Sequence, residues 1–223
     1  MGLIELENMQ KNSGLEKKRE LIYPTKYLVF FLVLSGKKKL LNQSWVGGDT
    51  VNFSIGQGFL NATPIQIVNM VAMIANEGVI YKPRIVNKIL KGGGNEVLLE
   101  NKPEILRKTN LISKNTFKLL KKYMRSVITY GTARYAVLTK AVEVGGKTGT
   151  GQTGIDGFEN SSFIGLAPYN GSADNQIIVF SLVEAKSNVD WWPAKSTDLI
   201  MQGIFANQSY EDILKGYRPW YIR

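Results

Sequence analysis

The sequence predicts an α+β fold in which an antiparallel sheet is packed with helices. Three strand-like segments, 141 to 150, 162 to 168 and 176 to 184, follow one another with connections that carry no helical pattern. Strands joined by short non-helical connections pair antiparallel, because parallel neighbours need a long crossover, usually a helix. Two segments with helical periodicity precede these strands and one follows them, so helices are available to cover the sheet.

The first predicted helix begins at a capping box and ends at a glycine. Thr63-Pro64-Ile65-Gln66 combines the capping box with proline at the first helical position. Ile67, Val71 and Ile74 then recur on one apolar face, and Gly78 ends the helix. Further along, the segments 79–81, 85–90 and 97–99 are predicted to be extended, with a glycine-rich turn before the last.

Two more helices flank the predicted sheet. One begins at Ser113 and ends at Gly131. Its expected apolar face consists of Phe117, Leu120, Met124 and Val127. The other opens near Pro193, and its expected apolar residues are Leu199, Ile200, Ile204 and Phe205. Both faces are predicted to pack in the core.

The composition excludes several classes of catalytic site. The 223 residues contain no His and no Cys, which rules out Ser-His-Asp and Cys-His nucleophiles, disulfides, and zinc bound by imidazole or thiolate. We expect no metal site and no cofactor. A net charge of +10 favours anionic partners. The lysines are scattered and no RNA-binding motif with stacking aromatics occurs, so we expect no nucleic-acid partner.

No export signal or membrane-spanning segment is recognisable in the sequence. Residues 1–7 lack the basic and apolar regions of a signal peptide. The apolar run 27–34 is eight residues long, whereas a spanning helix needs about 20, so we expect a buried strand there.

Lys147-Thr148-Gly149-Thr150 is the motif most informative about function. It follows the apolar alternation 141–144 and precedes a glycine-containing loop and the next predicted strand. The ammonium group supplies positive charge, the two hydroxyls supply donors, and the glycine lets an extended peptide approach the backbone. We therefore expect an accessible strand that binds a carboxylate.

Two nucleotide-binding motifs overlap the same residues. Gly145-Gly146-Lys147-Thr148 resembles the end of a P-loop, but Ala141 stands where the first glycine belongs, and a P-loop lysine opens a helix. Residues 149–154 fit G-x-G-x-x-G, yet residues 155–160 cannot begin the helix that binds a pyrophosphate. Both matches are interpreted as accidental.

Four segments in order carry a resemblance to a known family. They are Trp45–Gly58, Thr63–Gln66, Gly131–Ala133 and the stretch 141–153 around the lysine-threonine-glycine motif. Together they resemble the C-terminal part of the transpeptidase domain of a penicillin-binding protein, of the class B, elongation-type, penicillin-binding protein 2-like group. The likeness covers roughly residues 45 to 206 and implies a partial penicillin-binding or β-lactamase-like fold.

The resemblance implies acyl transfer in cell-wall synthesis. In the family, a serine attacks the penultimate D-Ala of a peptidoglycan stem peptide and passes the acyl group to a neighbouring stem, and β-lactams acylate the same serine. Lys147 is implied to supply positive potential, Thr148 and Thr150 to bind the substrate carboxylate, and the Thr150 amide to contribute to the oxyanion hole. Gly149 completes this binding strand. The family further implies cell-elongation membrane proteins as partners and the extracytoplasmic, periplasmic face of the bacterial inner membrane.

The chain departs from the family at the catalytic motifs. The family's S-x-x-K occurs here only as Ser35-Gly36-Lys37-Lys38, in a basic turn without a helix start, and we expect S-x-N to be lacking. We therefore assign no catalytic residue and expect the serine nucleophile upstream of Met1. We therefore expect three segments. Residues 1–45 are an atypical N-terminal segment, residues 46–206 are the C-terminal part of a transpeptidase domain, and residues 207–223 are a C-terminal tail.

Three functional hypotheses remain open. The first is a fragment of a peptidoglycan D,D-transpeptidase that is inactive alone. The second is a noncatalytic module that binds cell-wall peptides through the Lys147 strand. The third is a stand-alone β-lactamase-like serine hydrolase that uses Ser35.

Overall fold

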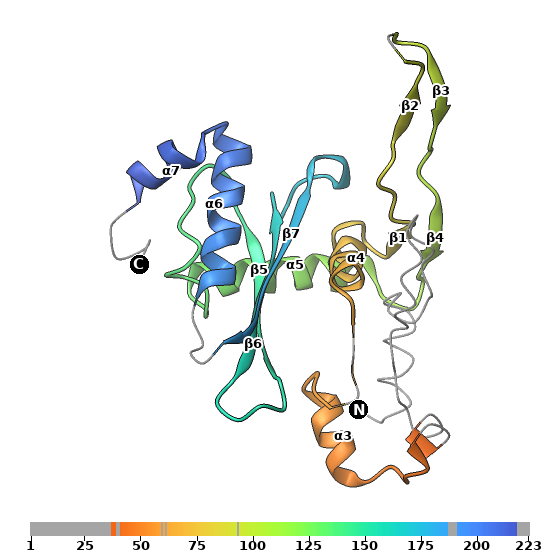
Figure 1. Ribbon diagram of the computed structural model, residues 1–223, viewed down its shortest axis with the longest axis vertical. Helices are drawn as coiled ribbons and strands as arrows, with labels where there is room; N and C mark the ends of the chain where they lie inside the picture. The colour runs from red at the N-terminus through yellow and green to blue at the C-terminus, as the bar shows by residue number, and fades with distance from the viewer. Residues whose placement is uncertain are drawn as a thin grey trace. The chain divides into compact units, whose positions relative to one another are not determined.

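The computed structural model describes residues 37–38, 41–58, 60, 62–92, 94–186 and 191–217 (Figure 1). The predicted strand at 27–34 and Ser35 lie outside these residues. The chain divides into two compact units, Met1–Met73 with Gly78–Leu111, and Ile74–Glu77 with Ile112–Arg223.

The first unit contains the helices α3 (Gly47–Ser54) and most of α4 (Pro64–Ala75). The predicted start of α4 is confirmed, because the Thr63 N–H donates to the Gln66 side chain at 2.8 Å. Its end is confirmed as well: Gly78 has φ 102° and its N–H donates to the Met73 carbonyl. On the expected apolar face Val71 is buried and its neighbours on that face are half-buried.

Two short antiparallel ladders complete the first unit. β1 (Val79–Tyr81) pairs with β4 (Ile105–Lys108), and β2 (Lys88–Leu90) pairs with β3 (Val97–Glu100). The predicted extended segments 79–81 and 97–99 are confirmed, whereas only the last three residues of 85–90 form a strand. Every residue of β2 and β3 is exposed.

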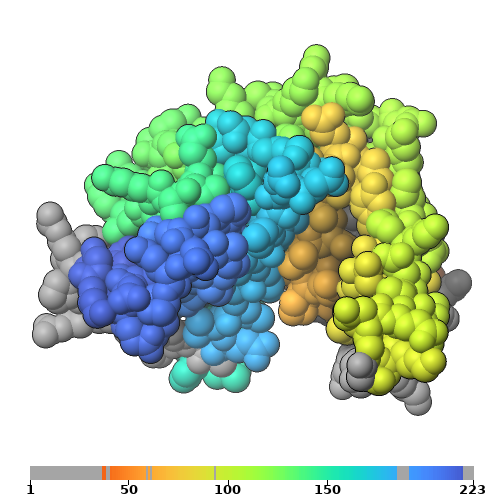
Figure 2. Space-filling view, turned by 90° about the horizontal axis from the view of Figure 1, so that it is seen from above, coloured from red at the N-terminus to blue at the C-terminus, as the bar shows by residue number. Residues whose placement is uncertain are grey.

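The second unit is a three-stranded sheet with helices on both faces. Its elements are α5 (Lys114–Thr129), β5 (Gly145–Gln152), β6 (Glu159–Ala167), the 3-10 turn η1 (Ala173–Asn175), β7 (Ile177–Lys186), α6 (Trp192–Ala206) and α7 (Tyr210–Gly216). The strand order β5-β6-β7 is antiparallel throughout, as predicted. A Cβ on Gly145 would meet α5, whereas one on Gly165 would meet α6, so the two helices cover opposite faces. Figure 2 shows α6 and α7 together at the surface beside β7.

The predicted strand at 141–150 starts too early. The ladder begins at Gly145, which pairs with Leu166, and residues 141–144 precede it. Val144 is nevertheless buried in the core. The apolar alternation therefore reported burial correctly, but it did not report strand pairing, which depends on the distant partner β6.

The predicted core faces of α5 and α6 are partly wrong. Phe117 and Met124 of α5 are buried, but Leu120 is exposed and Ile128 is buried instead. In α6 the expected Ile200 and Ile204 are exposed. The buried residues of α6 are Pro193, Ala194, Thr197, Asp198 and Met201.

Close approach between α6 and the sheet explains this face. A Cβ on Gly165 would lie 2.8 Å from the Thr197 Cγ2 atom, so only small side chains fit between them. The core of the unit packs around this contact. It consists of Ile128, Ala133, Ala136, Val137, Val144, Phe163, Ala167, Ala194 and Met201.

Candidate active site

The Lys147–Thr150 motif lies in the middle of strand β5. In the described part of the chain β5 pairs with β6 alone, so the motif occupies an edge strand, and Lys147 is exposed. This confirms the predicted accessible edge. The P-loop alternative is wrong, because Lys147 lies within a strand and opens no helix.

Strand alternation divides the motif between two faces. Thr148 and Thr150 point to the face covered by α6, and Lys147 points to the other. A cavity of about 230 Å³ opens on the threonine side. Its lining residues are Thr132, Thr148, Gly149, Thr150, Ser161, Ser162, Trp191, Pro193 and Ala194. Lys147 is not among them, and its Nζ donates to the Thr148 carbonyl at 2.7 Å.

Hydroxyl groups from three segments meet at this cavity. The Thr132 and Thr148 Oγ1 atoms share a hydrogen bond of 3.1 Å, and the Ser162 hydroxyl donates to the Gly149 carbonyl at 3.3 Å. Sequence reasoning used Gly131-Thr132-Ala133 only for the resemblance and missed Ser161 and Ser162. Their signal was the register of the hairpin, which places Ser161 opposite Thr150.

Gly149 leaves room for the hydroxyl of its cross-strand neighbour Ser162. A Cβ built on Gly149 would lie 2.5 Å from the Ser162 Oγ atom, which is too close for any real contact. Gly151, two residues along the same strand, would meet nothing closer than 3.9 Å. The glycine therefore allows Ser162 to stand beside the motif.

The catalytic motifs of the expected family are not assembled by the described residues. Ser35 lies outside them, and Lys38, its formal partner in S-x-x-K, is exposed. The expectation that S-x-N is lacking is wrong by letter, because Ser113-Lys114-Asn115 matches it. Ser113 is the N-cap of α5, and its Oγ accepts from the Thr116 N–H at 3.1 Å. Ser113 also lies after the Trp45 segment, whereas the S-x-N motif of the family lies before it. Ser113 is therefore interpreted as a helix cap.

A family model described as the penicillin binding protein transpeptidase domain matches residues 28–206. The chain belongs to this family.

Similar proteins agree with the expected penicillin-binding protein 2-like resemblance. Stage V sporulation protein D of Bacillus subtilis is 35% identical over 136 residues, which is 59% of this chain and 20% of that protein. Peptidoglycan D,D-transpeptidase MrdA of Acinetobacter baumannii is 27% identical over 152 residues, 68% of this chain and 22% of that protein. The chain thus spans about a fifth of the length of these relatives.

Solved structures share the fold. Pseudomonas aeruginosa PBP2 in complex with WCK 5153 superposes with a TM-score of 0.71 at 25% identity, covering 92% of this chain and 44% of that one. A complex between PBP2 and MreC from Helicobacter pylori superposes with a TM-score of 0.70 at 22% identity, covering 92% of this chain and 37% of that one. The mixed fold with a partial transpeptidase domain is confirmed.

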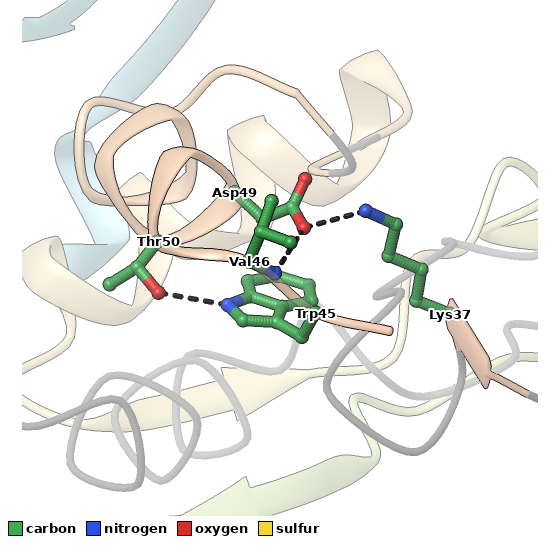
Figure 3. Close-up of polar contacts among 5 residues, drawn as sticks. All are labelled: Lys37, Trp45, Val46, Asp49 and Thr50. Atoms are coloured by element: carbon green, nitrogen blue, oxygen red, sulfur yellow. Dashed lines mark hydrogen bonds and ion pairs between the residues drawn. The ribbon is translucent and has the colours of Figure 1, made fainter. Parts of the chain in front are cut away.

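Lys37 and the start of the Trp45–Gly58 segment form a polar cluster in the first unit (Figure 3). The Lys37 ammonium group donates to the Asp49 carboxylate at 2.6 Å, and the Val46 N–H donates to the same oxygen at 2.9 Å. The Trp45 indole donates to Thr50. The hydrogen bond from Lys37 is the main cause that lowers the pKa of Asp49, with the Val46 amide second. The cluster fixes the start of α3.

The described residues contain no group of acidic, His or Cys side chains that could hold a metal ion. Within the same residues, no helix is both long and apolar enough to cross a membrane.

Proposed function

We propose that this chain supplies the substrate-binding wall of a peptidoglycan D,D-transpeptidase. The observation that carries the proposal is the hydroxyl-lined cavity on an edge strand, where Thr132, Thr148 and Thr150 converge. Such donors suit the carboxylate of a terminal D-Ala, because hydrogen bonds to a charged acceptor are stronger than those between neutral groups. Lys147 adds positive potential from the same strand.

The proposed reaction needs a nucleophilic serine in addition to these hydrogen-bond donors. Its hydroxyl attacks the carbonyl carbon of the penultimate D-Ala, the peptide C–N bond breaks, and terminal D-Ala leaves with the proton. An amine of a second stem then attacks the acyl carbon, an amide C–N bond forms, the ester C–O bond to serine breaks, and the amine proton passes to the serine oxygen. The Thr150 N–H is proposed as one donor to the oxyanion that forms at the carbonyl.

We place this serine outside the 223 residues. Ser35 is the only serine followed three residues later by lysine, and it stands ten residues before the Trp45 segment that should follow a nucleophile at long range. The chain alone is therefore proposed to bind stem peptide without being acylated. A noncatalytic peptide-binding module would use the same cavity.

Partners and location follow from the family as proposals. Stem peptides and β-lactams are the proposed ligands, and the outer face of the bacterial inner membrane is the proposed location. Cell-elongation membrane proteins are the partners proposed from the family, and the solved Helicobacter pylori complex joins a penicillin-binding protein to MreC.

A titration with N-acetyl-D-alanyl-D-alanine tests the proposal on the chain itself. With ¹³C-methyl-labelled threonine, we expect the NMR signals of Thr132, Thr148 and Thr150 to move, and that of Thr129 in α5 to stay. Thr148→Val and Thr150→Val should each weaken binding about tenfold, since each removes one charge-assisted hydrogen bond.

Thr129→Val is the matched control, because its hydroxyl is exposed and donates only locally to the Arg125 carbonyl. The L-alanyl-L-alanine analogue controls for chirality. Equal affinity of both valine variants and the unchanged chain would reject the carboxylate site.

A further inference from the structure

One buried carboxylate has no part in the proposed substrate contacts. Asp198 in α6 is 0% exposed. Its Oδ1 atom accepts from the N–H groups of Leu138 and Thr139 at 2.9 and 2.7 Å, and its Oδ2 atom accepts from the Tyr217 hydroxyl at 2.6 Å. Burying a carboxylate is costly unless its acceptors are satisfied, and here each oxygen has a donor. The two backbone amides tie the Oδ1 atom to residues 138 and 139.

The Leu138 and Thr139 amides lie at the end of the segment 131–139, which contributes Thr132 to the cavity lining. The start of this segment is fixed to α5, where the Gly131 and Ala133 N–H groups donate to helix carbonyls at 2.9 and 3.0 Å. Its end is fixed to α6 by Asp198 and by the hydrogen bond between the Thr139 hydroxyl and the Gln202 side chain. Thr132, which lines the cavity and bonds to Thr148, lies between these two attachments.

Another part of the cavity lining belongs to the first turn of α6. Pro193 and Ala194 line the cavity, and Ala194 lies four residues before Asp198, on the same face of the helix. Asp198 therefore connects two elements that both line the cavity.

We propose that Asp198 is a positioning residue that sets the distance between Thr132 and the first turn of α6, and with it the width of the carboxylate-binding cavity. The ligand named here rests on the proposed function, whereas the connection through Asp198 does not. The Tyr217 hydroxyl donates a hydrogen bond to the second carboxylate oxygen of Asp198. Burial, followed by this hydrogen bond, raises the pKa of Tyr217, so its hydroxyl stays protonated as a donor.

Three variants of the 223-residue chain test this role through threonine methyl spectra without ligand. Asp198→Ala removes every acceptor, and we expect the Thr132 and Thr148 signals to shift while that of Thr116, at the start of α5, stays. Asp198→Asn keeps one carbonyl acceptor and should shift the same signals in the same direction by less. Tyr217→Phe is the matched control, because it removes only the hydrogen bond to Oδ2 and keeps those from the Leu138 and Thr139 amides to Oδ1. The Thr132 and Thr148 signals should therefore stay in place.

Dipeptide titration adds a second readout. Affinity should fall about tenfold in Asp198→Ala, by less in Asp198→Asn, and not in Tyr217→Phe. Unshifted Thr132 and Thr148 signals in a folded Asp198→Ala chain would overturn the proposal, as would equal shifts in Tyr217→Phe. If circular dichroism shows that Asp198→Ala does not fold, Asp198→Asn decides: unchanged site signals overturn the proposal. Absence of dipeptide binding to the unchanged chain would reject the proposed function alone, because the ligand-free spectra report positioning separately.

Discussion

The sheet β5-β6-β7 and the hairpin β2-β3 are both antiparallel ladders, yet only the sheet contributes to a core. In β6, Phe163 is 1% exposed and Leu166 is fully buried, whereas Leu98 in β3 is 59% exposed. The sheet has α5 and α6 on its faces, and β2 and β3 are exposed along their whole length. Extended apolar sequence thus predicted strand-forming segments in both regions, but the packing helices decide which ladder buries its side chains.

Cross-strand ion pairs accompany the exposed ladder. Lys88 and Glu100 lie 3.1 Å apart, and Lys91 and Glu96 lie 3.0 Å apart, with between 47% and 64% of each side chain exposed to solvent. Such pairs contribute about 0 to 1 kcal/mol each. The comparison therefore predicts large effects in the sheet and small ones in the hairpin.

The largest effect is expected for Phe163→Ala. Removing this buried ring should lower the free energy of unfolding of the second unit by about 3 to 5 kcal/mol, through lost burial and the cavity left behind. Leu98→Ala in the hairpin is the control and should change stability by less than about 0.5 kcal/mol. Urea denaturation followed by circular dichroism measures both, and equal losses would break the comparison.

A smaller loss is expected for Gly149→Ala. The added methyl would lie 2.5 Å from the Ser162 Oγ atom, so this hydroxyl must rotate away and lose its hydrogen bond to the Gly149 carbonyl. The loss should cost about 0.5 to 1.5 kcal/mol of unfolding free energy. Gly151→Ala on the same strand is the matched control, with 3.9 Å of space. Ser162→Ala should recover part of the loss, and a double-mutant cycle without coupling would contradict the stated contact.

The polar cluster around Asp49 predicts an acid-sensitive start of α3. Because the folded-state pKa of Asp49 lies below its ordinary value, its stabilising contribution is present at neutral pH and lost as the pH falls through that lowered pKa. The Trp45 indole NMR signal should follow this titration. In Asp49→Asn the acid transition should disappear. A transition that persists there would assign it to another group.

The smallest effect is expected for Glu100→Gln in the hairpin. Its ion pair with Lys88 is exposed, so the free energy of unfolding should fall by less than about 0.5 kcal/mol, and less still in high salt. A loss above 1 kcal/mol would mean that the hairpin depends on this pair.

Local patterns predicted the elements, whereas distant contacts decided their buried faces. The capping box at Thr63 and the N-cap at Ser113 involve neighbours within one helical turn, so the sequence alone located both helix starts. The buried face of α6 depends on its close approach to Gly165, which no helical periodicity encodes.

The candidate site divides in the same way. The Lys147 strand was predictable from its composition. Ser161 and Ser162 reach the cavity through hairpin register, and Asp198 reaches residues 138 and 139 from sixty positions away in the chain. The hairpin register could have indicated the two serines. The contacts of Asp198 are nonlocal, and one sequence carries no signal for them.

Intact-protein mass spectrometry after incubation with a penicillin tests the central claim most directly. The claim is that this chain carries the carboxylate-binding strand of a transpeptidase but no serine that attacks. Acylation requires a nucleophile with a base within hydrogen-bond reach, and the described residues assemble none around the cavity. We expect the folded chain to keep its unmodified mass. A stoichiometric adduct, mapped to Ser35 or to a serine of the cavity, would contradict it and identify the chain as an enzyme in its own right.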